Sequence, residues 1–202
     1  MSFFDYFEIA ALALALAFVI AKALYLRLAR QTAAIMIGRR RSIAFIFELL
    51  AVVGFTAWAV EILLCAFHSR FDLVPAALRF VWFNSFALKV LGMVLVSLGL
   101  LLDLLALVNF GDSWRVGIDN EKAGALVTDG VFALTRNPIY VAFDLIFLGV
   151  FLINGTWIFL VFALLAMFAS HQQIIREERF LTQQYGSAYI DYCRRTPRYL
   201  IC

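Results

Sequence analysis

Charged residues are scarce in this sequence. They make up 15% of its 202 residues, whereas hydrophobic residues make up 64%. A soluble domain averages about 25% charged and about 45–50% apolar residues. A single water-soluble core therefore does not account for the composition, but repeated membrane spans do, because each span needs roughly 20 mostly apolar residues. The formal net charge of only +3 gives no indication of a nucleic-acid partner.

The motifs of several large enzyme classes are also absent. The sequence has no Gly-x-Gly-x-x-Gly dinucleotide fingerprint, no P-loop, and no zinc or hydrolase motif. Its cysteines, Cys65, Cys193 and Cys202, share no metal-ligand spacing, so we expect no metal. The N-terminus carries Asp5 and Glu8 in place of the basic start of a signal peptide, so the first apolar run is predicted to be a retained span.

What the chain does contain is long apolar stretches. They cover residues 6–26, 43–67, 86–109 and 139–170. Because a backbone in lipid must satisfy its own hydrogen bonds, each stretch is predicted to be helical. The last stretch is interrupted at Asn154-Gly155-Thr156. It is too long for one span, whereas each half is too short. As a helix, residues 139–153 would be roughly 22 Å long, less than the thickness of about 30 Å of the hydrocarbon core. We therefore expect a helical hairpin there and five transmembrane helices in total.

The basic residues between these stretches predict an orientation. Five arginines crowd the first loop: Arg27, Arg30, Arg39, Arg40 and Arg41. Loops rich in Lys and Arg favour the cytoplasm. The N-terminus is therefore predicted to lie outside, and the loop 110–138 and the tail 171–202 are predicted to lie in the cytoplasm.

Two polar segments flank the hairpin. Asn137-Pro138 stands at its start, where Pro suits a first helical turn and Asn is a good N-cap. The free N–H groups of such a helix start suit a carboxylate. A plain cap on a membrane helix explains Asn137-Pro138 equally well. Glu177 and Glu178 follow the last apolar stretch and are placed to bind an amino group or ribose hydroxyls. Glu–Arg pairing on a solvated helix face is the alternative for these glutamates.

Other residues raise further expectations. Tyr185, Tyr189 and Tyr192 follow at helical spacing and are interpreted as an interfacial aromatic belt. Ionisable residues within membrane spans often mark function. For Glu61 and Asp103 we expect a hydrogen bond between helices, whereas Asp144 lies one turn beyond Tyr140 and is placed to face the same pocket.

In their order along the chain, these elements resemble the isoprenylcysteine carboxyl methyltransferase family and its phospholipid methyltransferase relatives. The similar part runs from about Phe110 to Leu200. It comprises Leu126-Val127-Thr128-x-Gly130-x-Phe132, Arg136-Asn137-Pro138-x-Tyr140, a hairpin, Glu177-Glu178-x-x-Leu181, Tyr185-Gly186-x-x-Tyr189-x-x-Tyr192 and Thr196-Pro197-Arg198. The resemblance implies an all-α integral membrane bundle in which S-adenosylmethionine, entering from the cytoplasm, methylates a small or lipid-like membrane-associated acceptor.

The resemblance also implies site residues. The three helices of residues 1–109 would precede a part, 110–202, that carries the cofactor loop, the hairpin and the helical tail within one membrane domain. Candidate cofactor-binding residues are Ala125, Leu126, Val127, Phe132, Asn137, Pro138, Ile139, Tyr140, Glu177 and Glu178, and candidate catalytic residues are Arg136 and Arg176. Membrane lipids are the other expected partners.

Two positions depart from the family pattern. Asn137 stands where the family has the His of Arg-His-Pro, and Gln173 stands where prenylcysteine enzymes place an Arg, which leaves Arg176 as the nearest substitute. Asn is not a titrating base, so an acceptor that is already ionised, a carboxylate or thiolate, is favoured over an amine.

Two alternative functions remain open at this stage. One is an NADPH-dependent membrane reductase of the sterol reductase type, and the other is a non-catalytic membrane protein on the same scaffold. The third loop has few basic residues for the phosphates of NADPH, since Arg115, Lys122 and Arg136 are outnumbered by Asp112, Asp119, Glu121 and Asp129.

Overall fold

The computed structural model describes residues 1–30, 43–68, 75–111 and 126–200. Within these ranges the fold is all-helical, as expected, and the one pairing of extended chain is an isolated bridge between Val81 and Thr156. The long helices are α1 (Phe3–Arg30), α2 (Ile43–Ala66), α3 (Phe86–Asn109), α4 (Pro138–Asn154) and α5 (Trp157–Tyr185). The short ones are η1 (Ala76–Arg79), η3 (Gly130–Ala133) and α6 (Ser187–Arg195).

The long helices identify an integral membrane protein. In the described part of the chain, four of them, α1, α2, α3 and α5, are long and apolar enough to cross a membrane, and α4 is a shorter apolar helix. With 17 residues α4 rises about 25 Å, so this arm of the hairpin is short, as predicted. The other arm differs from the prediction, because α5 has 29 residues. Helix-forming residues continue beyond position 170 without Gly or Pro until Gly186.

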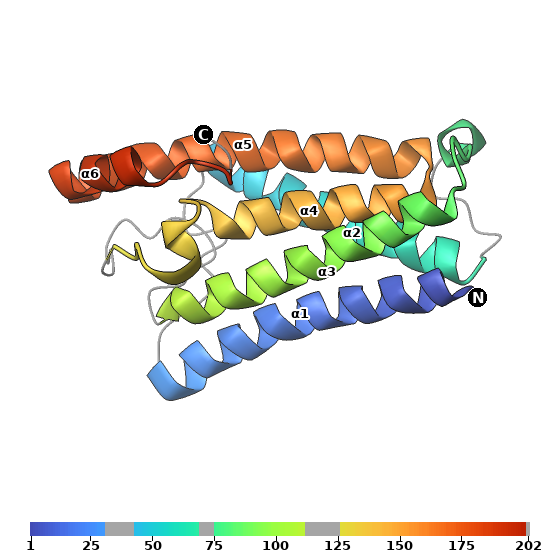
Figure 1. The fold of residues 1–202 in the computed structure, drawn as a ribbon, viewed down its shortest axis with the longest axis horizontal. Coiled ribbons are helices and arrows are strands. Elements are labelled where there is room, and N and C mark those ends of the chain that lie inside the picture. Colours follow the sequence, from blue (N-terminus) through green and yellow to red (C-terminus); the bar gives the residue numbers. More distant parts are fainter. Residues whose placement is uncertain (31–42, 69–74, 112–125, 201–202) are drawn as a thin grey trace.

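The long helices run side by side and alternate in direction (Figure 1). One end of the bundle therefore collects the N-terminus, the end of α2, η1 and the α4–α5 turn. The opposite end collects the end of α3, η3, the start of α4, the last turns of α5 and α6. We call this second end, where the sequence predicted a site, the tail end.

Helices α3 and α4 approach each other closely, and this contact positions the tail end. A Cβ at Gly92 would lie 2.5 Å from the carbonyl oxygen of Gly149, and one at Gly99 would lie 2.8 Å from that of Ala142. Glycines at these positions let two backbones meet in a membrane, where close packing drives helix association. The start of α4 is thereby fixed against the end of α3.

Polar contacts close the end of the bundle opposite the tail end. Gly155, with φ at 66°, ends α4, and its carbonyl accepts a 2.7 Å hydrogen bond from the Trp82 N–H. The Asn154 amide donates to Glu8 at 2.6 Å. Glu61 was expected to form a hydrogen bond between helices, and its partner is Arg79 of the short helix η1, at 3.1 Å. Glu61 and Arg79 are 18 residues apart, and spacing along the chain does not reveal their contact.

Candidate functional site

The start of α4 lies under the C-terminal tail. Pro138 occupies the first turn, as predicted, but the Asn137 side chain makes no cap hydrogen bond. Its amide instead donates to the carbonyl oxygen of Arg198 at 3.2 Å. The prediction of an Asn137 side-chain cap is therefore wrong: the amide is held by the returning tail, and its oxygen accepts no hydrogen bond from the first turn of α4.

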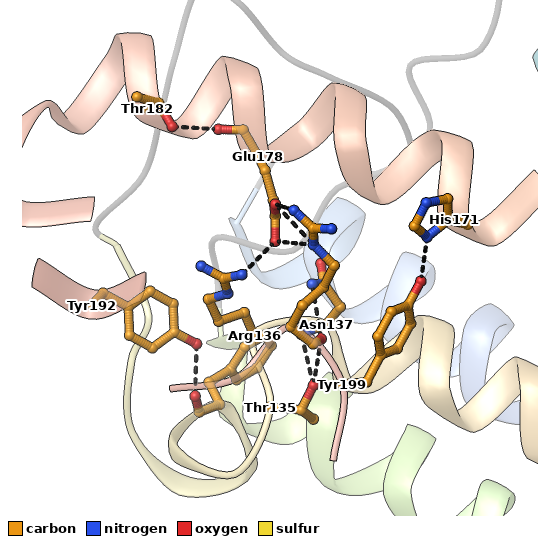
Figure 2. A network of polar contacts seen from close by, with 10 residues as sticks. Thr135, Arg136, Asn137, His171, Glu178, Thr182, Tyr192 and Tyr199 are labelled. Atoms are coloured by element: carbon orange, nitrogen blue, oxygen red, sulfur yellow. Dashed lines mark hydrogen bonds and ion pairs between the residues drawn. The ribbon is translucent and has the colours of Figure 1, made fainter. Parts of the chain in front are cut away.

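Further hydrogen bonds hold the tail against the start of α4. Thr135 is fully buried, and its hydroxyl donates to the Arg198 carbonyl at 2.9 Å. The Arg136 N–H donates to the Pro197 carbonyl at 3.0 Å. The Thr196-Pro197-Arg198 segment thus lies across the start of α4, as Figure 2 shows for the contacts of Thr135 and Asn137.

Glu178 stands between two arginines (Figure 2). Arg136 approaches one carboxylate oxygen at 3.1 Å and Arg198 approaches the other at 2.7 Å. The side chains of Glu178 and Arg136 are only 13% and 11% exposed. The hydrogen bond to Glu178 raises the pKa of Arg198. Glu–Arg pairing is therefore present, but it joins α5, the segment just before α4 and the tail in a largely buried network and not on a solvated face.

Glu177 points to α4 and meets Tyr140. The Tyr140 hydroxyl donates to Glu177 Oε1 at 2.5 Å, and the Gln173 amide donates to the same oxygen at 3.2 Å. Two residues predicted from separate motifs, 37 positions apart, are thus in direct contact. The second oxygen, Oε2, takes part in neither bond.

A third polar group lies one turn further along α4. Asp144 faces Ser170 and His171 of α5, so it does share the α4–α5 interface with Tyr140. His171 Nδ1 lies 2.6 Å from the Tyr199 hydroxyl, and the two rings are stacked (Figure 2). Sequence reasoning assigned no role to His171 or Tyr199; the one available signal was a histidine placed where an apolar run ends.

The remaining candidates form an apolar wall. Val127, Phe132 and Ile139 pack together with Ala106 and Val131. Tyr189 and Tyr192 are buried, and the Tyr192 hydroxyl donates to the Phe132 carbonyl at 2.6 Å. Burial raises the pKa of Tyr192 to about 12. The aromatic-belt interpretation is therefore wrong for Tyr189 and Tyr192, because Gly186 ends α5 and the tyrosine face of α6 packs inward.

The structure places the other predicted residues as follows. Leu126 and Val127 lie in the coil before η3, and Ala125 lies outside the described residues. Arg176 directly precedes Glu177 on α5 and is half-buried. Arg136 to Tyr140, Phe132, Glu177 and Glu178 gather at the tail end.

These groups can hold a small ligand that carries one positive and one negative charge. Arg136 Nε is buried and has no hydrogen-bond partner among the described residues, which leaves a donor for an anion. Glu177 supplies a carboxylate for a cation, and Phe110 and Phe132, edge to face at 5.0 Å, add apolar surface beside them. A zwitterionic ligand with an apolar part fits this donor set.

Known proteins share this part of the chain. The family model described as phospholipid methyltransferase matches residues 87–188, just over half of the chain. Protein-S-isoprenylcysteine O-methyltransferase of Schizosaccharomyces pombe is 34% identical over 46% of this chain and 40% of its own length. Isoform B of that enzyme from Arabidopsis thaliana is 29% identical over 61% of each chain, and the Xenopus laevis enzyme is 30% identical over 54% of this chain and 39% of its own. The chain thus spans about 39–61% of these relatives.

Proposed function

Because the chain belongs to the phospholipid methyltransferase family of membrane proteins, we propose that it transfers the methyl group of S-adenosylmethionine to a small or lipid-like acceptor in the membrane. The observation that carries this proposal is the contact between Tyr140 and Glu177. It joins the two motifs that the family resemblance singled out, at the end of the bundle where the polar groups gather. The relatives named above methylate isoprenylcysteine, and that substrate is not carried over here.

The residues at the tail end fit the parts of S-adenosylmethionine. The Arg136 Nε donor and the first turn of α4 suit its carboxylate. Glu177 suits its ammonium or its ribose hydroxyls. Leu126, Val127, Phe132, Pro138 and Ile139 provide the apolar wall for its adenosine part.

When bound, this cofactor supplies a methyl group on a sulfonium, which is already an activated leaving group. The protein's part is then to orient the two reactants and to exclude water. The Tyr140 and Gln173 hydrogen bonds hold the Glu177 carboxylate in one orientation. The tail segment from Thr196 to Arg198 covers the start of α4 and shields the site.

The first prediction concerns the identity of the cofactor. The detergent-purified protein is expected to bind S-adenosylhomocysteine saturably in calorimetry and to give no heat of binding with NADPH. Arg136 and Arg198 both pair with Glu178, which leaves the Arg136 Nε donor for one carboxylate but little net positive charge for the several phosphates of NADPH. Saturable binding of NADPH, with none of S-adenosylhomocysteine at millimolar concentration, would instead identify a reductase.

The second prediction concerns orientation. The alternating helices place the N-terminus and the tail end at opposite ends of the bundle (Figure 1), and the arginines of the first loop favour a cytoplasmic tail end. We therefore expect the N-terminus outside and the C-terminus in the cytoplasm, where a charged soluble cofactor is available. A reporter enzyme fused after Cys202 is expected to be active on the cytoplasmic side, and activity confined to the outer side would contradict this orientation.

A further inference from the structure

An open apolar groove lies on the surface of α1 and α3, which run side by side (Figure 1). Its volume is about 540 Å³, within the range of pockets that hold one small ligand. The Ser97 hydroxyl in its wall donates to the Met93 carbonyl at 2.8 Å, so the proton of this polar group is already used. Apolar side chains line the rest of the groove, among them Phe3, Phe4, Val90, Val94, Leu98 and Leu101.

The groove is long enough for one acyl chain. Its α3 wall recurs every three or four residues from Phe86 to Leu101, on the face turned away from Gly92 and Gly99, which pack on α4. This wall spans about 22 Å along the helix, whereas one leaflet takes up about 15 Å, half of the hydrocarbon core. Val94 and Leu98 are 48% and 50% exposed. No other helix of the described chain covers this face, so a membrane molecule can reach it.

Lys89 stands at the end of the groove near the N-terminus. Its ammonium lies 5.3 Å from the centre of the Phe4 ring, which is part of the groove wall. Among the described residues no carboxylate forms an ion pair with Lys89. Glu8 is close enough to act on it electrostatically, but the Glu8 carboxylate already accepts a hydrogen bond from the Asn154 amide. A half-buried ammonium beside an apolar groove is therefore available to an anionic partner.

Lys89 also lies at the level expected for lipid head groups. Trp82 stacks on Trp157 with 4.7 Å between the ring centres, and both rings are exposed, as tryptophans at a membrane–water interface are. Lys89 is three residues beyond Phe86, the first residue of α3, which is about 5 Å along the helix. A lysine at this depth extends its ammonium to the interface. A phosphate group at the interface would meet it at the end of the groove.

We propose that this groove binds one acyl chain of a phospholipid and that Lys89 binds the phosphate of the same molecule. The groove matches the apolar chain of such a lipid in length and volume, and the ammonium matches the negative charge of its head group. Lys89 lies at the end of the bundle opposite the tail end (Figure 1). The bound lipid is therefore a component of the folded bundle and is distinct from the methyl acceptor of the proposed function.

Native mass spectrometry of the delipidated protein in detergent tests this site with two probes of identical acyl chains, dioleoylphosphatidylglycerol and dioleoylglycerol. The first phosphatidylglycerol molecule is expected to bind about tenfold or more tightly than dioleoylglycerol, the size of one charge-assisted hydrogen bond. Lys89→Gln is expected to weaken this first step by a similar factor of about ten or more. Val94→Trp fills the groove from an exposed position and is expected to abolish the step. Melting temperatures near that of the parent show that both variants are folded.

Lys22→Gln is the matched control, because the Lys22 ammonium also lies over an aromatic ring, 5.8 Å from the centre of Tyr25, but outside the groove. It is expected to leave the first binding step unchanged. An equal loss in Lys22→Gln and Lys89→Gln identifies unspecific attraction and overturns the site. Equal binding of the two probes, or unchanged binding in Lys89→Gln or Val94→Trp, overturns it as well. A lipid-free protein dimer that Val94→Trp dissociates would make a second copy of the chain the occupant, and this also overturns the proposal.

Discussion

Glu177→Gln is expected to weaken the binding of S-adenosylhomocysteine by roughly tenfold to a hundredfold. The substitution keeps the size of the side chain and its acceptor for the Tyr140 hydroxyl, but it removes the negative charge that would face the ligand's ammonium or ribose. A lost hydrogen bond to a charged partner costs roughly 1.5–3 kcal/mol, and about 1.4 kcal/mol is a factor of ten in affinity. Calorimetry on the detergent-purified variant measures the change directly.

Two further variants serve as controls for this measurement. Glu61→Gln makes the same chemical change at the opposite end of the bundle, where Glu61 pairs with Arg79, and is expected to leave the affinity unchanged. Tyr140→Phe keeps the charge of Glu177 but removes the hydroxyl that orients it, so its loss of affinity is expected to be smaller than that of Glu177→Gln. Normal binding by a folded Glu177→Gln protein means that the tail glutamate is not a cofactor contact.

The helices could be predicted from the sequence because composition alone forces them. Four long apolar stretches in lipid have to be helical, and the observed α3, at Phe86–Asn109, begins and ends at the predicted residues. The prediction was less accurate for the second arm of the hairpin. The polar residues after position 170 were assigned to a separate tail, yet they continue α5 to Tyr185. The error arose because a count of apolar residues does not detect a helix that continues beyond the membrane without a break.

The site could be predicted in part. Short motifs located Tyr140 and Glu177, and the structure brings the two into contact. The motifs did not reveal that the Asn137 amide bonds Arg198, 61 residues away, or that His171 meets Tyr199, 28 residues away. Such contacts depend on the path of the tail after α6. The absence of a histidine at position 137 favoured an acceptor that is already ionised, whereas the fold places a different histidine, His171, beside the α4–α5 interface.

Glu178 holds the tail in place. It is next to Glu177 in the sequence, but its role is structural, whereas Glu177 is the proposed cofactor contact. Glu178→Gln leaves Arg136 and Arg198 facing a neutral amide, and Arg136 is largely buried. Breaking a buried ion pair from one side costs about 3–5 kcal/mol, and the lower end applies here because Arg198 is 40% exposed. We therefore expect a loss of about 3 kcal/mol in the free energy of unfolding. The melting temperature should fall by about 6–12 °C, at about 2–4 °C per kcal/mol for a chain of this size.

Thermal unfolding in detergent separates this role from cofactor binding. Asp191→Asn is the matched control, because it removes a carboxylate from an Asp191–Arg194 pair at the same end of the protein whose side chains are 61% and 75% exposed. An exposed pair of this kind contributes less than about 1 kcal/mol, so its melting temperature should barely move. Glu177→Gln, in turn, should lose affinity while melting closer to the parent protein than Glu178→Gln does. If Glu178→Gln melts like the parent, the Arg136–Glu178–Arg198 network does not fix the tail. The cover over the start of α4 is then held by the hydrogen bonds that the Thr135 hydroxyl, the Asn137 amide and the Arg136 N–H donate to the tail carbonyls.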